Sequence, residues 1–192
     1  MLAIAVRIGQ ALCLHMRNPP FYVDTLEQEL RRRTWQAIGV LDLATSLDRA
    51  SEPMMQSEWL KSHPPANTND EDIWLGMTGP FKGLPKGTFT EMSHSLIIAE
   101  GQLVARSILF TDFIEKTEKS PEAQQQMIDH FKKVATSFLG DLGPEQEPFQ
   151  LYTSRVASIV YGYLQLGILR PLSRSRISRP PSAPREFILG LA

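Results

Sequence analysis

The strongest helical pattern in this sequence runs over residues 25–49, and it constrains the fold more than any other segment. Thr25 and Gln28 suit a capping box at its start, and Trp35 lies where we expect an internal anchor. Side chains recur at three-to-four-residue spacing along one side: Leu26, Leu30, Thr34, Ile38, Leu41 and Thr45. This spacing predicts one long helix that buries that side against a core.

Three consecutive arginines, Arg31, Arg32 and Arg33, lie in the first half of this helix. Glu27 and Glu29 precede Arg31 and Arg33 by four residues, the favourable order for ion pairs on a helix. A run of three basic residues is shorter than a typical nucleic-acid-binding patch. We therefore expect a solvated, ion-paired face at the edge of a core helix.

Helical patterns dominate the rest of the chain as well. Ser120 and Pro121 form a clear helix start, and Gly140 ends that helix. Thr88 and Glu91 suit a capping box for another helix. The further predicted helices cover residues 2–15, 89–117, 121–139 and 148–169. Since no stretch alternates like a strand, the predicted fold class is all-α, an irregular helical domain of about five main helices.

A long Pro/Gly-rich loop joins two of these helices, over residues 51–87. It holds Trp59, Trp74 and Phe81, and large rings left in water forgo roughly 1.5–3 kcal/mol each. We therefore predict a lid across the helical body, with at least one ring covering a cavity between helices. A small effector would bind under this lid and at the helix that begins near Thr90. The simpler alternative is a lid that only completes the core.

The composition is that of an ordinary globular protein, with a net charge of −1 over 192 residues. This charge argues against a clamp for nucleic acid, whose affinity comes from many phosphate contacts. Cys13, the only cysteine, is interpreted as a small buried hydrophobe in a helix. The longest apolar stretch, residues 156–169, is too short for a membrane span and contains Gln165. The first residues look like the middle of an amphipathic helix rather than a signal peptide, so we expect a fragment or a truncated gene product.

The composition changes after Pro171, where arginines stand among serines and prolines. Such a sequence cannot bury enough apolar surface to offset its ordering entropy. We therefore expect a helical domain over residues 1–171, incomplete at its N-terminus, and a disordered basic tail over residues 172–192. A basic address signal or a nonspecific polyanion contact is the functional alternative for this tail.

No pattern for catalysis or metal binding stands out. The histidines His15, His63, His94 and His130 lie on four different segments, and no pair has the spacing of a helical zinc site. The glycine- and lysine-containing residues 79–88 lack the end of a phosphate-binding loop. We therefore expect no catalytic residue, no metal ligand and no enzymatic activity.

A set of short motifs follows in a recognisable order along the chain. The residues that carry it are His15, Glu29, Arg31, Arg32, Arg33, Trp35, Asp42, Pro53, Asn67 and Asp70. The ordered set resembles the regulatory domain of fungal zinc-cluster transcription factors, called the middle homology region or fungal-specific transcription factor domain. It covers residues 8–112 well and 150–172 loosely, and it departs from the family pattern at Cys13, Gln36 and Ser51.

The resemblance implies a regulatory domain of a nuclear fungal transcription factor that controls transcription by RNA polymerase II. It implies DNA binding by a six-cysteine zinc cluster, which Cys13 alone cannot form, so zinc and DNA contacts are expected only outside this chain. A coregulator, a dimer partner or a small effector are the other partners that it implies, with no membrane. The alternative is a stand-alone helical ligand- or protein-binding module without DNA function.

Overall fold

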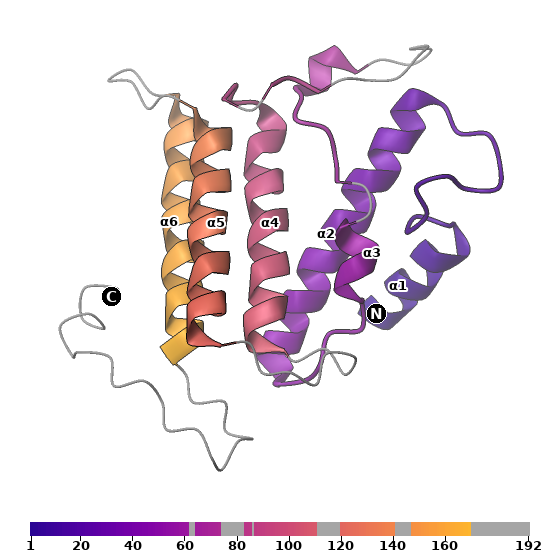
Figure 1. Cartoon of the computed structure of the whole chain (residues 1–192). Coiled ribbons are helices and arrows are strands. Elements are labelled where there is room, and N and C mark those ends of the chain that lie inside the picture. The colour runs from indigo at the N-terminus through magenta and orange to yellow at the C-terminus, as the bar shows by residue number, and fades with distance from the viewer. Residues whose placement is uncertain (62–63, 74–82, 86, 111–119, 141–146, 170–192) are drawn as a thin grey trace.

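The computed structural model of the chain describes residues 1–61, 64–73, 83–85, 87–110, 120–140 and 147–169. Its α-helices are α1 Leu2–Ala11, α2 Thr25–Arg49, α3 Ser57–Lys61, α4 Glu91–Leu109, α5 Pro121–Leu139 and α6 Pro148–Leu169, with a short 3-10 helix η1 at Asp70–Asp72. No strand is present within these ranges. The prediction of an all-α fold is therefore confirmed (Figure 1).

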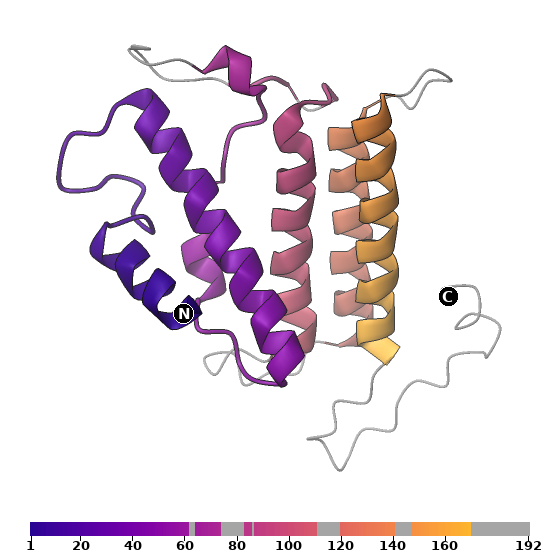
Figure 2. The same cartoon turned by 180° about the vertical axis from the view of Figure 1, so that it is seen from behind.

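Helices α4, α5 and α6 form an up-down bundle at one end of the molecule (Figures 1 and 2). The Gly87 N–H just before α4 donates to Ser137 O near the end of α5, and Gln150 Nε2 in α6 donates to Leu139 O. These contacts fix the antiparallel order. The bundle core is apolar, with Ile97, Ile128, Phe131 and Leu164 almost completely buried.

Helix α2 lies on the other side of α4, and α1 packs on α2 at the far end of the molecule (Figure 1). A second apolar cluster holds this side together: Val6, Leu14, Trp35, Met55 and Leu60. Trp35 is 1% exposed, so the predicted internal anchor of the Arg-Trp helix is confirmed.

Three helix starts can be compared with the prediction. Asp24, and not Thr25, caps α2, since its side chain accepts from the Glu27 N–H at 2.7 Å. The capping box of α4 uses Thr90 and Ser93, two residues beyond the predicted pair, because Thr90 has the extended backbone that a cap needs. Ser120 caps α5 as predicted, accepting from Ala123 N–H.

The predicted buried face of α2 is wrong. Leu30 is 51% exposed, and Thr34 and Leu41 are also exposed. The side that faces the protein instead carries Glu29, Trp35, Gln36, Gly39, Asp42, Leu43 and Ser46. Apolar spacing could not find this side because much of it is polar.

Helix α1 also ends earlier than predicted, at Ala11. Cys13 has a φ of +57° and is only partly buried, so its expected place as a core residue inside a helix is corrected. Helix α4 ends at Leu109 with extended backbone at Phe110, and the remainder of that predicted helix falls outside the described residues. So does the predicted tail over residues 172–192.

In the part of the chain that the structure covers, no helix is long and apolar enough to cross a membrane.

Candidate functional site

The segment after α2 crosses the molecule over α2 and α4, and we call its residues 51–61 and 64–73 the strap (Figure 1). It includes α3 and η1, and Met55, Leu60 and Thr68 within it are buried. The strap has little regular structure, so its backbone N–H and C=O groups need partners from elsewhere. Side chains of α2 and α4 supply them.

Asp42 holds the beginning of the strap. Its carboxylate accepts from the N–H groups of Met54 and Met55, both at 3.0 Å. Arg106 of α4 donates to the same carboxylate at 2.9 Å and to Met55 O at 2.8 Å. Asp42 is 0% exposed and the Arg106 side chain is 3% exposed, so this ion pair is shielded from water. Removing one member of such a buried, hydrogen-bonded ion pair strongly destabilises the fold, because the other charge stays buried without its partner.

Gln36 holds the middle of the strap. Its Nε2 donates to Leu60 O at 2.6 Å, and its Oε1 accepts from Gln102 Nε2 of α4 at 2.9 Å. Trp35 Nε1 donates to Trp59 O at 3.1 Å. A Cβ at Gly39 would lie 2.6 Å from Leu60 Cδ2, so α3 packs where α2 has no side chain.

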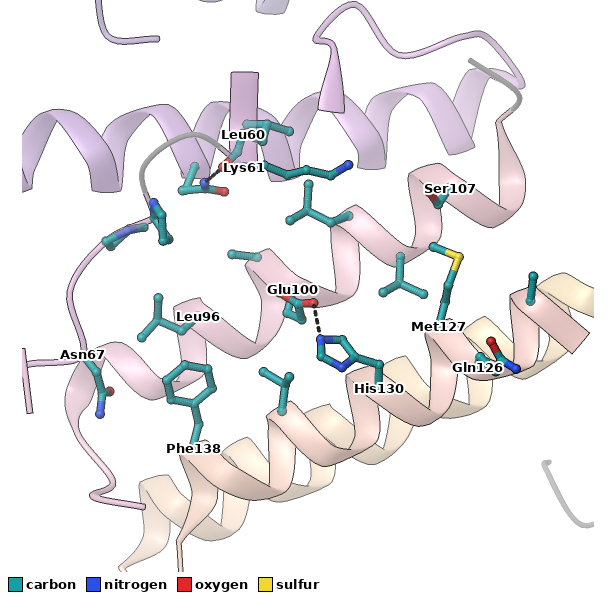
Figure 3. A pocket seen from close by; sticks show the side chains of 18 of the residues that line it. Leu60, Lys61, Asn67, Leu96, Glu100, Ser107, Gln126, Met127, His130 and Phe138 are labelled. Atoms are coloured by element: carbon teal, nitrogen blue, oxygen red, sulfur yellow. Dashed lines mark hydrogen bonds and ion pairs between the residues drawn. The ribbon is translucent and has the colours of Figure 1, made fainter. Parts of the chain in front are cut away.

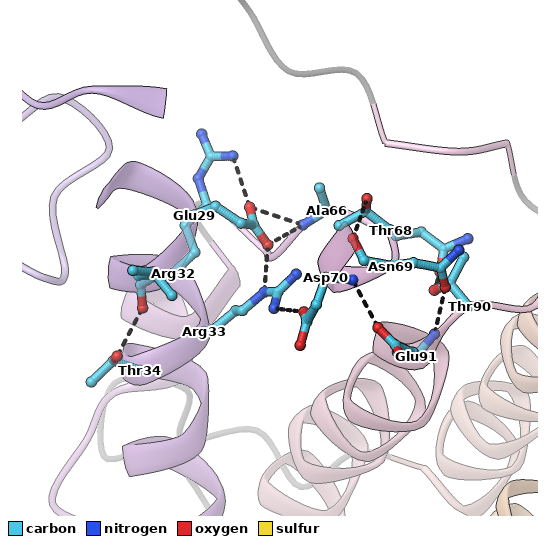
Figure 4. Close-up of polar contacts among 12 residues, drawn as sticks. Glu29, Arg32, Arg33, Thr34, Ala66, Thr68, Asn69, Asp70, Thr90 and Glu91 are labelled. Carbon is cyan, nitrogen blue, oxygen red and sulfur yellow. Dashed lines mark hydrogen bonds and ion pairs between the residues drawn. The ribbon is translucent and has the colours of Figure 1, made fainter. Parts of the chain in front are cut away.

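Glu29 holds the later part of the strap (Figure 4). Its buried carboxylate accepts from Ala66 N–H at 3.0 Å and from Arg33 Nε at 3.1 Å. Arg32 lies 3.7 Å from the same carboxylate. Arg33 also reaches Asp70 of η1, at 2.6 Å. We call Glu29, Gln36, Asp42, Gln102 and Arg106 together the clasp.

Asn67 joins the strap to the start of α4. Its Oδ1 accepts from Thr90 Oγ1 at 2.8 Å and from Ser93 Oγ at 3.1 Å, and its Nδ2 donates to Thr88 O at 3.0 Å. Nearby, the Asp70 N–H donates to Glu91 Oε2 at 2.7 Å (Figure 4). The cap of α4 and the strap therefore form one hydrogen-bonded unit.

The structure thus brings four of the ten family-signature residues together. Glu29, Arg32, Arg33 and Asp70 meet at the end of the strap. The ion pairs expected for these arginines are confirmed, but the solvated face is not: the side chains of Arg32 and Arg33 are 27% and 20% exposed, and both pair with buried Glu29.

The other signature residues lie apart from that group. Arg31 turns away, pairing with Glu27 at 3.3 Å and donating to Leu12 O. The His15 ring lies 5.9 Å from the Trp35 ring and 6.2 Å from that of Trp59. Pro53 precedes the two N–H groups that Asp42 holds.

The predicted lid can be followed at one ring only. Trp59 is half-buried and packs against the cluster around Trp35. Trp74 and Phe81 lie outside the described residues. The lid therefore stays a prediction, while the strap is a packed segment.

A groove of about 980 Å³ lies between the strap, α4 and α5 (Figure 3). Its floor is α4, one wall is α5, and the opposite wall comes from α3, the strap and Leu84. The apolar residues that line it are Leu60, Pro64, Pro65, Leu84, Leu96, Ala99, Leu103, Val104, Ala123, Met127, Val134 and Phe138. Its size and mainly apolar lining are typical of small-molecule sites.

Seven polar residues also line this groove, and three of them, Lys61, Glu100 and His130, carry ionisable side chains. Glu100 of α4 lies midway along the floor, and His130 of α5 reaches it only at 3.9 Å (Figure 3). Lys61 on the strap wall pairs with Glu58 at 2.9 Å. Sequence analysis missed this site because Lys61, Glu100 and His130 belong to three separate elements. A weak signal lay in the spacing of apolar residues along α5, where Met127, Val134 and Phe138 recur on one side.

His94 lies at the opposite face of α4, against α6. Its ring stacks on Tyr152 at 5.4 Å and lies 5.8 Å from Phe149. Burial lowers the pKa of His94, because the apolar surroundings disfavour its charged form. Within the described ranges, no three His, Cys, Asp or Glu side chains gather as metal ligands would.

Nearly the whole chain aligns with curated fungal proteins. It is 31% identical over 193 residues to the C6 finger domain transcription factor nscR of Aspergillus fumigatus, covering 96% of this chain and 24% of that protein. It is 30% identical over 183 residues to nscR of Arthroderma benhamiae, covering 94% and 25%. The C6 finger domain transcription factor adaR of Aspergillus niger is 25% identical over 202 residues, covering 94% and 26%.

The predicted resemblance to fungal zinc-cluster transcription factors is therefore confirmed. The chain spans about a quarter of the length of these relatives. No family model matches the chain. No solved structure matches it either.

Proposed function

We propose, from this similarity to C6 finger domain transcription factors, that the chain is a helical regulatory domain of such a factor. The observation that carries the proposal is a contrast within the alignment. The similarity extends over 96% of the chain, yet Cys13 is the only cysteine, so no six-cysteine finger lies within these residues. Contact with DNA would come from a zinc cluster outside this chain, in a protein that acts in the nucleus on transcription by RNA polymerase II.

The geometry suits regulation better than catalysis. The groove offers a concave apolar surface, and the clasp joins its strap wall to α2 and α4. A coregulator, a dimer partner or a small effector that binds there would act on helices at both sides of the strap. The net charge of −1 gives the chain no excess of positive charge, whereas nonspecific DNA binding depends on many contacts between basic side chains and phosphates.

A reporter experiment tests this proposal. The chain is inserted between a heterologous DNA-binding domain and an activation domain in a fungal host, and an inert helical insert of equal length serves as the control. We expect reporter output to change severalfold with the chain and not with the control. Equal output from both would contradict the proposal, and so would sequence-selective, salt-tolerant DNA binding by the purified chain in a mobility-shift assay.

The groove also favours a second candidate, a stand-alone helical ligand-binding module without DNA function. The genomic sequence upstream of the codon for Met1 separates the two. An in-frame six-cysteine cluster there supports the regulatory domain, and an intact gene without one supports the stand-alone module.

A further inference from the structure

The groove is an elongated trough along one face of α4. Lining residues on α4 extend from Leu96 to Ser107, which at 1.5 Å per residue is a length of about 16 Å. Leu96 and Phe138 lie toward one end, and Ser107 and Met127 toward the other (Figure 3). This shape fits an elongated, mainly apolar molecule lying parallel to α4.

The charged side chains that line the groove indicate which polar group such a molecule would carry. Glu100 is 29% exposed and sits between the two ends (Figure 3). His130 is 67% exposed and lies 3.9 Å away, beyond hydrogen-bond distance. Lys61 is already paired with Glu58. Among the charged groups that line the groove, the Glu100 carboxylate is therefore the least neutralised by a partner. A carboxylate accepts hydrogen bonds and repels anions.

The strap wall is held in place before any ligand arrives. Leu60 and Asn67 of this wall are fixed by Gln36 and by Thr90, and the Leu84 N–H donates to Asn67 O at 2.7 Å. A wall fixed by buried hydrogen bonds loses little conformational entropy when a ligand binds. The groove is thus a preformed site rather than one that a ligand must create.

We propose that this groove binds an elongated apolar small molecule that donates a hydrogen bond from a hydroxyl or amine near its middle to Glu100. The proposal rests on the regulatory function above and names the chemical class of its effector. It assigns the apolar body of the molecule to the α4–α5 trough and its donor group to the Glu100 carboxylate.

Three fluorescent anthracenes with a polar group on the central ring test this assignment. They are 9-anthracenemethanol, 9-(aminomethyl)anthracene and anthracene-9-carboxylate, titrated into the purified chain and followed by fluorescence anisotropy. We expect saturable binding of the alcohol and the amine. A charge-assisted hydrogen bond makes them at least about tenfold tighter than the carboxylate. Glu100→Gln should remove most of this preference.

Matched tryptophan variants locate the site. Ala123→Trp fills the groove and should weaken the alcohol and the amine severalfold, whereas Lys133→Trp, on an exposed position of the same helix outside the groove, should not. Circular dichroism checks that both variants fold. If Ala123→Trp does not fold, hydrogen exchange in the unaltered chain locates the site instead. The alcohol or the amine should then slow exchange at Leu60 and Asn67.

Several results overturn the proposal: no saturable binding, a carboxylate that binds as tightly as the alcohol, or equal effects of the two tryptophan variants. The same titration can be repeated with a longer protein that contains this chain. If the anthracenes bind the chain but not that longer protein, the groove is covered by another part of the protein, and this result would also overturn the proposal. The reporter experiment uses no anthracene, so failure here leaves the proposed regulatory function standing.

Discussion

The two sides of α4 are built in different ways. Toward α5 and α6, α4 buries an apolar face that includes Ile97, Val104 and Ile108. Toward α2 and the strap, it buries Gln102 and Arg106. The first side is held by apolar packing, and the second by side chains that hydrogen-bond to an irregular backbone.

This difference determines which amino-acid substitutions each side of α4 can tolerate. Apolar cores accept other side chains of similar volume with modest losses. A buried polar network is strict, since each group left without its partner carries its full desolvation cost. We therefore expect changes in the clasp to release the strap, and changes in the bundle to lower stability without releasing it.

The largest effect is expected for Asp42→Ala. It leaves the Arg106 charge buried and removes the acceptor of two strap N–H groups, so the free energy of unfolding should fall by about 3–5 kcal/mol. Urea unfolding measures the loss. Asp48→Ala, on an exposed position of the same helix, should stay within about 0.5 kcal/mol of the unaltered chain. Equal losses from both would mean that the clasp contributes no more than a surface charge.

Trp35→Ala should come next. The ring is buried among Val6, Leu14 and Leu60, so its loss should cost on the order of 3 kcal/mol. Thermal and urea unfolding measure this loss. An unchanged midpoint would show that the second apolar cluster does not stabilise the α2 side.

A smaller effect is expected for Ser120→Ala in the bundle. The change removes the side-chain cap of α5, where Ser120 accepts from Ala123 N–H, and should cost about 1 kcal/mol. Hydrogen exchange should rise in the first turn of α5 and stay unchanged in the strap. Faster exchange at Met54 or Met55 in this variant would break the proposed separation between the two sides.

The smallest effect is expected for Lys61→Ala. Lys61 and its partner Glu58 are both exposed, and such a surface pair contributes well under about 1 kcal/mol. Arg33→Ala is the sharper comparison, because Arg33 pairs with buried Glu29 and with Asp70 and should cost more. An order reversed between these two variants would contradict the role given to Glu29.

The same contrast explains how much of the fold could be predicted. Residues 121–139 and 148–169 were predicted closely because apolar periodicity and clear end signals, such as Ser120, agree there. The range of α2 was also right, but its orientation was wrong. Glu29, Gln36 and Asp42 are polar, so apolar spacing does not mark them as buried. Only their partners in the strap and α4 make their burial possible.

The site was less predictable than the fold. The motif order revealed the family resemblance without showing that Glu29, Arg33 and Asp70 meet, since their contact depends on the path of the strap. Glu100 and His130 carry no local signal of a groove, which exists only because α5 and the strap flank α4. Long-range placement of this kind is not encoded in the spacing of neighbouring residues.

Residue-resolved hydrogen exchange at Met54, Met55 and Ala66 tests the central claim most directly. These N–H groups lie outside helices, and their acceptors are the carboxylates of Asp42 and Glu29. The clasp predicts slow exchange at all three in the unaltered chain. In Glu29→Gln, protection should weaken at Ala66 alone, whereas the control Glu27→Gln should change none of them. Fast exchange at all three while α4, α5 and α6 stay protected would contradict the clasp.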